Sequence, residues 1–177
     1  MKDCICKEEV PMSFLDLAKE RYSCREFTGQ PVEDEKIKEI VEAGLAAPTA
    51  ANLQPYRIWV IRGEENAAKI AETTKFTFGA KDFILVGAAP EEGWVRPFDK
   101  ANFCDVDASI VATHIMLAIE DAGLGTTWVG FFDAPKFAEL FPETKGYHLD
   151  ALFPIGYKKG GPAPKHTQRN PEVVKYL

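Results

Sequence analysis

Residues 105–122 limit the possible folds of this chain more than any other segment. Their apolar side chains fall on nearly every face of an α-helix, and Gly123 provides a stop signal directly after them. A helix that is apolar all round has to be covered on several sides. The segment therefore predicts a long helix at the centre of a domain or at an interface between two subunits.

The flanking sequence predicts the elements that surround this helix. Helices are predicted at 13–22, from 33 to just before Pro48, at 64–74 and at 135–141. Strands are predicted at 57–62, 83–88, 126–132 and 149–157, and the continuously apolar run at 83–88 indicates burial on both faces. Helices and strands mixed in this order predict an α+β layer fold. The tail at 171–177 is short and partly apolar, and we expect it to pack on a second subunit.

The composition restricts the class of protein. A length of 177 residues, with 46% hydrophobic and 27% charged residues, fits one globular domain. We assign that domain to 12–177 and treat 1–11 as an N-terminal extension. The net charge of −6 argues against nucleic-acid binding, which relies on clustered cations. No apolar run approaches the roughly 20 residues of a membrane span, and no secretory signal is present, so we expect a cytoplasmic protein without a membrane partner.

The four cysteines and three histidines do not follow a metal-ligand spacing. Cys4 and Cys6 form a C-x-C pair near the N-terminus, but no histidine accompanies them at ligand spacing. In a reducing compartment such cysteines are free thiols. We therefore predict no metal site, and we interpret Cys24 as a small buried side chain and not as a redox thiol.

The segment Arg21-Tyr22-Ser23-Cys24-Arg25 has the chemistry of an anion site. In an extended backbone, residues i, i+2 and i+4 point the same way, so Arg21, Ser23 and Arg25 would face one ligand together. Guanidinium groups bind phosphate through paired N–H donors and stay charged at any working pH. The alternative is a solvated helix end whose arginines favour the C-terminal end of the helix dipole.

Three further segments show features of a ligand site. The small residues of 47–56 would let the backbone approach a flat ligand whose edge Asn52 and Gln54 could bind, although a plain turn is the alternative. The glycines of 123–130 follow a helix and lead into a strand, which is the reverse of the order in a dinucleotide fold. Gly130, within the predicted strand, indicates close approach of the backbone to a ligand or another chain. Arg169, taken singly, is a surface arginine of the tail.

Together and in this order, these segments resemble the nitroreductase family of FMN-dependent oxidoreductases. The resemblance covers nearly all of 12–177. It rests on Arg21-x-Ser23-x-Arg25, on Ala47-Pro48-Thr49-Ala50-x-Asn52-x-Gln54-Pro55, and on Asp107-Ala108 through Leu117 to Gly123-Leu124-Gly125. It implies a central, mostly antiparallel sheet flanked by helices, and a homodimer with the long helix at its interface.

The resemblance also implies a function and a set of FMN contacts. Hydride would pass from NAD(P)H through FMN to a small acceptor such as a nitroaromatic or a quinone, without a catalytic side chain. The implied contacts are Arg21, Tyr22, Ser23, Arg25, Pro48, Thr49, Ala50, Asn52, Gln54, Trp128, Val129, Gly130 and Arg169.

These contacts divide into groups with different roles. Arg21 and Ser23, joined by Arg169, would hold the phosphate end, whereas Arg25 would place a fixed positive charge at the pyrimidine edge of the ring. The residues of 48–54 would approach the same flavin from the other subunit, and backbone N–H groups near 128–130 would reach the ring nitrogen N5.

Two alternatives stay open at this point. One is a flavoprotein of the same fold with other chemistry, such as reductive removal of a substituent or a reaction that consumes the flavin. The other is a non-enzymatic flavin-binding redox module with Cys4 and Cys6 as its output. Two roles also stay open for the aromatic residues of 76–103, which either line an acceptor site or pack in the core. The chain is short for the family in this segment. The acceptor, and the choice between NADH and NADPH, therefore stay undefined.

Overall fold

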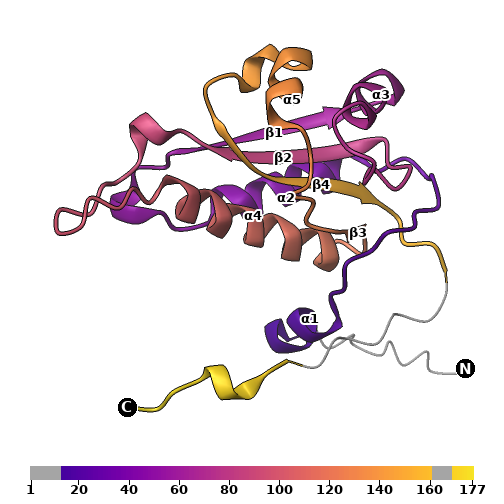
Figure 1. Ribbon diagram of the computed structural model, residues 1–177. Coiled ribbons are helices and arrows are strands. Elements are labelled where there is room, and N and C mark those ends of the chain that lie inside the picture. The colour runs from indigo at the N-terminus through magenta and orange to yellow at the C-terminus, as the bar shows by residue number, and fades with distance from the viewer. Residues whose placement is uncertain (1–12, 161–168) are drawn as a thin grey trace, which may run out of the picture.

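The computed structural model describes residues 13–160 and 169–177. Its centre is a sheet in the order β1-β2-β4-β3, in which every neighbouring pair of strands is antiparallel. The strands are β1 (Tyr56–Arg62), β2 (Asp82–Ala88), β3 (Gly125–Thr126) and β4 (His148–Gly156). The helices are α1 (Phe14–Glu20), α2 (Asp34–Leu45), α3 (Glu64–Ala71), α4 (Cys104–Asp121) and α5 (Ala134–Leu140). The predicted α+β fold with a central antiparallel sheet is confirmed (Figure 1).

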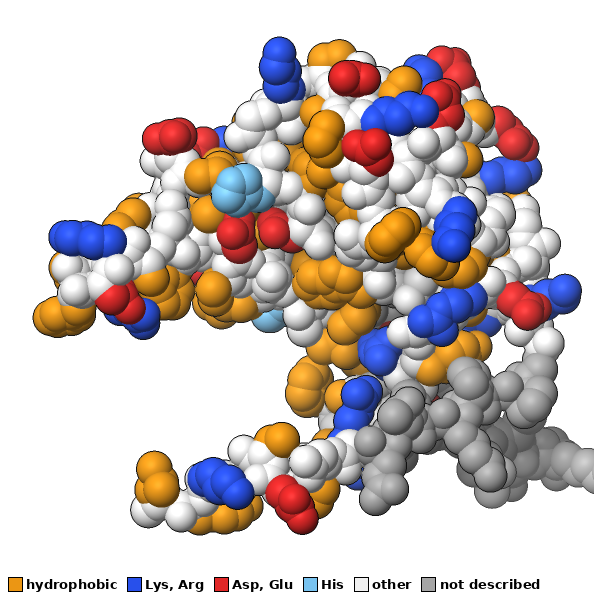
Figure 2. Space-filling view, in the orientation of Figure 1, with side chains coloured by type: hydrophobic (Ala, Val, Ile, Leu, Met, Phe, Trp, Pro, Cys, Tyr) orange, Lys and Arg blue, Asp and Glu red, His pale blue; other side chains and the backbone are white. Residues whose placement is uncertain are grey.

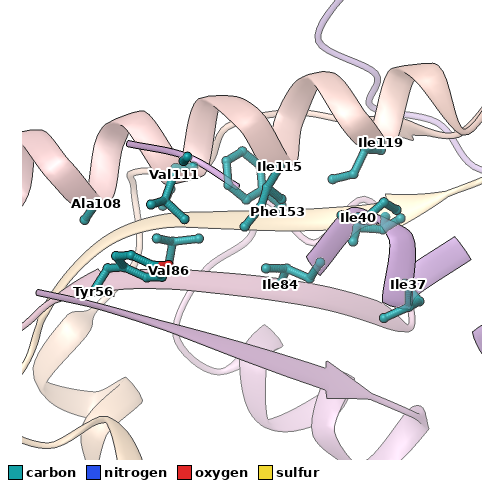
Figure 3. Close-up of a cluster of buried hydrophobic side chains, with 14 of the residues drawn as sticks. Ile37, Ile40, Tyr56, Ile84, Val86, Ala108, Val111, Ile115, Ile119 and Phe153 are labelled. Carbon is teal, nitrogen blue, oxygen red and sulfur yellow. The ribbon is translucent and has the colours of Figure 1, made fainter. Parts of the chain in front are cut away.

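Helix α4 lies along one face of the sheet and confirms the long helix predicted from its apolar side chains. Figure 3 shows Val111 and Ile115 of α4 close to Val86 of β2 and Phe153 of β4. The opposite strip of α4 is less well covered, and Val106 is 49% exposed there. A single chain therefore buries one side of α4 and leaves the opposite side partly exposed.

The other face of the sheet is covered by α3, α5 and a set of aromatic side chains. Phe83 and Leu85 of β2 pack there with Ile70 of α3 and Phe137 of α5. All residues of β2 are buried, as predicted for a strand with apolar layers on both faces. Among the described helices, none combines the length and apolar character that a membrane span requires.

Strand β4 contains a bulge that changes which residues face α4. A register shift beside Gly87 leaves Asp150 as an extra residue without a partner on β2. Strict alternation would put Leu149 and Ala151 on the same face, but Leu149 packs with the α5 side and Ala151 with the α4 side. Gly87 makes room for the bulge, because a Cβ there would lie 2.4 Å from the carbonyl oxygen of His148.

The strand predicted at 126–132 was wrong for most of its length, because β3 ends at Thr126. The register itself continues, since Thr126 pairs with Ile155 and Val129 forms an isolated bridge with Leu152. Between these pairs lies Pro154, which has no N–H to donate to the ladder. The hydroxyl of Thr126 donates instead to the Pro154 carbonyl, at 2.8 Å. Pro154 therefore interrupts the hydrogen bonding between β3 and β4, and residues 127–128 are not part of a strand.

Both ends of the described chain carry exposed apolar side chains. Helix α1 has no buried residue, and its Phe14 is 71% exposed. At the C-terminal end, η4 (Pro171–Val173) is followed by Tyr176, which is 96% exposed. Figure 2 shows this end as an arm that stands apart from the body, with a hollow between them. The predicted extension at 1–11, with Cys4 and Cys6, lies outside the described residues.

Candidate functional site

Segment 21–25 runs as an extended strand beside β3. The backbone of Arg21 is extended (φ −55, ψ 129), and Ser23 forms a parallel bridge with Thr126. The Cys24 N–H donates to the Thr126 carbonyl at 2.9 Å, and the Cys24 side chain is 2% exposed. Because Cys24 points inward, its neighbours Ser23 and Arg25 point outward. Cys24 is therefore a packing residue, as expected, and the segment has the extended backbone that the arginine spacing requires.

Packing beneath the segment fixes its position. A Cβ on Gly125 would lie 2.8 Å from the Cys24 sulfur, so only glycine allows this approach. Lys158 forms an ion pair with Glu120 at the end of α4, and its ammonium lies 5.3 Å from the centroid of the Tyr22 ring. Burial raises the pKa of the Tyr22 phenol above its ordinary value. Lys158 was not identified from the sequence, because nothing local distinguishes it from a solvated lysine.

Two arginines of the segment have no acidic partner in the described part of the chain. The Arg25 guanidinium bonds only the Ser23 carbonyl, at 3.3 Å, and Arg21 forms no ion pair there. By contrast, Arg62 and Arg96 are each paired with an aspartate. Unpaired guanidinium groups that share one extended segment can accept an external anion without breaking an existing interaction.

Arg25 also lines a cavity of about 190 Å³ with Trp128, Val129 and Gly130. The remaining lining residues are Thr127 and three aromatic side chains, Phe76, Phe78 and Phe131. A Cβ added to Gly130 would meet no atom within 4 Å, so no contact within the described chain requires glycine there. The structure thus brings together the predicted residues 25 and 128–130, and adds an aromatic wall from 76–78.

The loop 47–55 is held in a strained conformation. Ala51, Asn52 and Gln54 all have φ between 51° and 55°. Such left-handed backbone costs a non-glycine residue about 1 kcal/mol or more and is commonly found at functional sites. The Gln54 N–H donates to the Thr49 hydroxyl at 3.1 Å, and the Ala50 N–H donates to a carboxylate of α4 at 2.8 Å.

That carboxylate belongs to Asp107, a residue not predicted to take part in the site. Asp107 is 1% exposed, and its second oxygen has no hydrogen-bond partner among the described residues. A buried carboxylate in the first turns of an otherwise apolar helix face is costly unless it holds something in place. An acidic residue on the apolar side of the predicted helix was the sequence signal that could have identified Asp107 as part of the site.

The two halves of the predicted site lie at opposite ends of α4. The loop 47–55 is bonded to Asp107 near the start of the helix, whereas segment 21–25 is bonded to Thr126 just past its end. A helix of 18 residues is about 27 Å long. Figure 1 shows the two ends of α4 on opposite sides of the molecule. One chain therefore does not bring Pro48, Thr49, Ala50, Asn52 or Gln54 to Arg21, Ser23 and Arg25.

Arg169 also stands apart from the other predicted residues. It is exposed in the C-terminal arm and does not line the cavity beside Arg25. The described chain thus offers a half-site of two unpaired cations, an aromatic hollow and an open glycine. These residues fit one face of an FMN molecule, whose phosphate needs cations and whose ring needs a flat apolar wall.

The chain is similar in sequence to known proteins. The sequence matches the Nitroreductase family over residues 18–76 and 71–157. A protein of Archaeoglobus fulgidus, provisionally named NADH dehydrogenase/NAD(P)H nitroreductase, is 31% identical over 78% of this chain and 82% of its own. The NADPH-flavin oxidoreductase of Vibrio harveyi is 29% identical over 85% of this chain and 64% of its own.

Solved structures give the same result. A crystal structure of a nitroreductase family protein from Clostridium difficile has a TM-score of 0.87 and 33% identity, over 93% of this chain and 98% of that one. A provisionally named nitroreductase from Exiguobacterium sibiricum, solved in complex with FMN, has a TM-score of 0.80 and 21% identity, over 96% and 99% of the two chains. At that lower identity the likeness is one of fold. The family match and the 33% identical structure together establish that the chain belongs to the nitroreductase family.

Proposed function

We propose that the protein is an FMN-dependent oxidoreductase that works as a homodimer, with each FMN held between two protomers. When bound, FMN would supply the redox chemistry, accepting hydride from NAD(P)H and passing it to a small acceptor such as a nitroaromatic or a quinone. The observation that carries the proposal is the half-site itself. Arg25 has no acidic partner in the described chain and faces the same cavity as Trp128, Val129 and the open Gly130.

The residues of segment 21–25 would bind and orient the cofactor. Arg21 and Ser23 offer a guanidinium and a hydroxyl to the phosphate and its sugar chain, and Arg169 of the arm would add a second cation. Arg25 would hold a fixed positive charge beside the pyrimidine edge of the ring, where negative charge develops on reduction. Tyr22 stays in place as a packing neighbour of Lys158. No side chain is required to act as acid, base or nucleophile.

A second copy of the chain supplies the missing half of the site in this proposal. In a two-fold dimer, α4 of one protomer would pack antiparallel against α4 of its partner through the partly exposed strip at Val106. The start of one helix would then lie beside the end of the other. Loop 47–55 of one protomer would reach segment 21–25 of its partner, with Pro48, Thr49, Ala50, Asn52 and Gln54 facing the ring.

The exposed apolar ends of the chain support the same assembly. Phe14 of α1 is 71% exposed and Tyr176 of the arm is 96% exposed, so both offer surface that a partner could cover. A partner protomer would fill the hollow between the arm and the body that Figure 2 shows. A cytoplasmic location remains our prediction.

The aromatic wall favours a flat acceptor. Phe76 lies 5.7 Å from Phe131 in an edge-to-face pair and 6.0 Å from Phe78, measured between ring centroids. Phe131 is 73% exposed, so its ring is available to a molecule that enters the cavity. Stacking against such rings selects planar aromatic molecules over aliphatic ones.

One absorbance experiment tests the central proposal. Purified protein should show flavin absorption, either as isolated or after addition of FMN, and NADH or NADPH should bleach it in the absence of oxygen. A nitroaromatic or a quinone should then restore the colour. Protein that is colourless and binds no added FMN would contradict the proposal. Bound flavin that neither nicotinamide bleaches would point to another chemistry on the same fold.

A further inference from the structure

A second cluster of reactive side chains lies at the start of α4, next to the start of β4. Cys104 and Asp105 open the helix, and His148 and Asp150 lie at the first residues of the strand. The nearest ligand atoms of Cys104, Asp105 and His148 all lie within 4.8 Å of one another. Figure 2 shows a histidine beside acidic side chains on the face that it presents. None of these residues takes part in the proposed flavin site.

The β4 bulge creates this cluster. In a regular strand, His148 and Asp150 would share a face with Leu152, which packs on the α5 side. The extra residue at the bulge turns His148 towards α4, where its ring Nδ1 lies 2.8 Å from the Asp105 carboxylate. Bulges that re-aim a side chain in this way are frequently found beside functional sites. The fold therefore uses an irregularity to bring together donors from elements far apart in sequence.

The distances within the cluster suit one small metal ion. The Cys104 sulfur lies 3.4 Å from the Asp105 oxygen, which in turn is 2.8 Å from His148. Ligand atoms on one tetrahedral zinc ion are about 3.3–3.7 Å apart, given metal–ligand bonds of about 2.0–2.3 Å. Small side-chain movements would therefore bring all three donors onto one ion.

Asp150, two residues after His148, adds an unpartnered carboxylate next to these donors. One of its carboxylate oxygens is completely buried and has no hydrogen-bond partner among the described residues. Asp150 is not among the three residues whose ligand atoms lie within 4.8 Å of one another, so it is a neighbour of the site and not a ligand. A divalent cation bound by Cys104, Asp105 and His148 would add positive charge beside this unpartnered carboxylate.

We propose that Cys104, Asp105 and His148 form a binding site for a divalent transition metal, with zinc as the ion that suits them best. Sulfur, imidazole and carboxylate are donors that zinc prefers, and a water molecule would take the fourth position beside these three. Burial raises the pKa of the Cys104 thiol to about 11, so metal binding would release the proton of this thiol. The ion would tie the start of β4 to the start of α4, and α4 is also bonded to loop 47–55 through Asp107.

Metal binding can be tested directly on untagged, FMN-loaded protein. After treatment with a chelator and its removal, the protein is titrated with Zn²⁺ or Co²⁺ alone. We expect one ion per chain, a rise in melting temperature with Zn²⁺, and tetrahedral cobalt bands at wavelengths longer than the flavin absorption. Thiolate-to-cobalt charge transfer should be visible in protein from which FMN has been removed.

Three variants identify the ligands. His148→Gln, at an exposed position, should weaken Zn²⁺ binding by roughly tenfold or more, since even partners outside the first ligand shell contribute that much. Cys104→Ser should remove the charge-transfer band. The variant Cys4→Ser/Cys6→Ser should bind the metal as the wild type does. FMN content, measured separately, keeps this result independent of the proposed function.

Three outcomes would overturn the proposal. One is wild-type protein that binds no metal tighter than millimolar, and another is Zn²⁺ affinity that is the same in His148→Gln as in the wild type. The third is loss of the metal in the Cys4→Ser/Cys6→Ser variant, which would place it on the N-terminal pair.

Discussion

The Asp107 carboxylate on α4 accepts a hydrogen bond from the Ala50 backbone N–H at 2.8 Å. This bond joins the central helix to the strained loop 47–55, in which three non-glycine residues are left-handed. The buried charge of Asp107 therefore has a positional role. It fixes the loop that would meet the flavin of the partner protomer.

We expect Asp107→Ala to weaken FMN binding roughly ten- to hundredfold, because a hydrogen bond to a charged acceptor contributes about 1.5–3 kcal/mol. Asp107→Asn keeps an acceptor oxygen for the Ala50 N–H and should bind FMN nearly as well as the wild type. Flavin fluorescence gives the affinity, and thermal melting of the FMN-free proteins separates loop effects from general instability. Equal losses in both variants would mean that the charge, and not the hydrogen bond, is what matters.

Arg21→Ala should weaken FMN binding by roughly tenfold or more, where each tenfold step is about 1.4 kcal/mol. The reason is that Arg21 would bind the phosphate through paired N–H donors, and no described carboxylate competes for them. Arg96→Ala is the matched control, because Arg96 is paired with Asp99 far along the chain. FMN affinity that is unchanged in Arg21→Ala would remove the phosphate assignment.

Arg25→Ala should act on the reduction potential more than on the affinity. Loss of its positive charge disfavours the reduced, anionic ring, and we expect the potential to fall by roughly 30 mV, which corresponds to about 1.4 kcal/mol for a two-electron couple. Arg25→Lys retains the charge and should keep most of the wild-type potential. The measurement is an equilibrium titration against a redox dye. A potential that does not move in Arg25→Ala would place this guanidinium away from the ring.

Gly130→Ala separates a ligand contact from a packing contact. Its Cβ would meet no atom of the described chain within 4 Å, so the melting temperature of FMN-free protein should be unchanged. FMN affinity should nevertheless fall by roughly tenfold, or about 1.4 kcal/mol, because the ring would approach this backbone. Gly87→Ala is the contrasting case. Its Cβ would lie 2.4 Å from the His148 carbonyl, and we expect it to lose about 1–3 kcal/mol of stability with or without FMN.

The parts of this fold that follow from local pattern could be predicted from the sequence. The apolar surface of 105–122 and the unbroken apolar run at 83–88 identified the central helix and the doubly buried strand. The pattern of one segment does not show which residues of the neighbouring strand it will pair with. Pro154 interrupts β3 from the neighbouring strand, so 127–132 looked like a strand although most of it is not.

The site could be predicted only as a set of segments. The arginine spacing identified segment 21–25, and the small residues identified loop 47–55. The sequence did not show that the 18-residue helix α4 separates these two segments in space. Likewise, His148 and Asp105 are 43 residues apart and meet only because of a bulge in β4. Their contact leaves no trace in local spacing, which is why the histidines appeared scattered.

The position of the two half-sites at opposite ends of α4 leads to a test by subunit complementation. Arg21→Ala damages the half-site at the end of the helix, and Asp107→Ala damages the one at its start. In a heterodimer of these two variants, one shared site carries both defects and the other carries none. We therefore expect each homodimer to bind FMN weakly, and a heterodimer purified through two different tags to bind one FMN with wild-type affinity. If segment 21–25 and loop 47–55 served the same FMN from a single chain, each site of the heterodimer would carry one defect. Its affinity would then stay low, and the shared site would have to be abandoned.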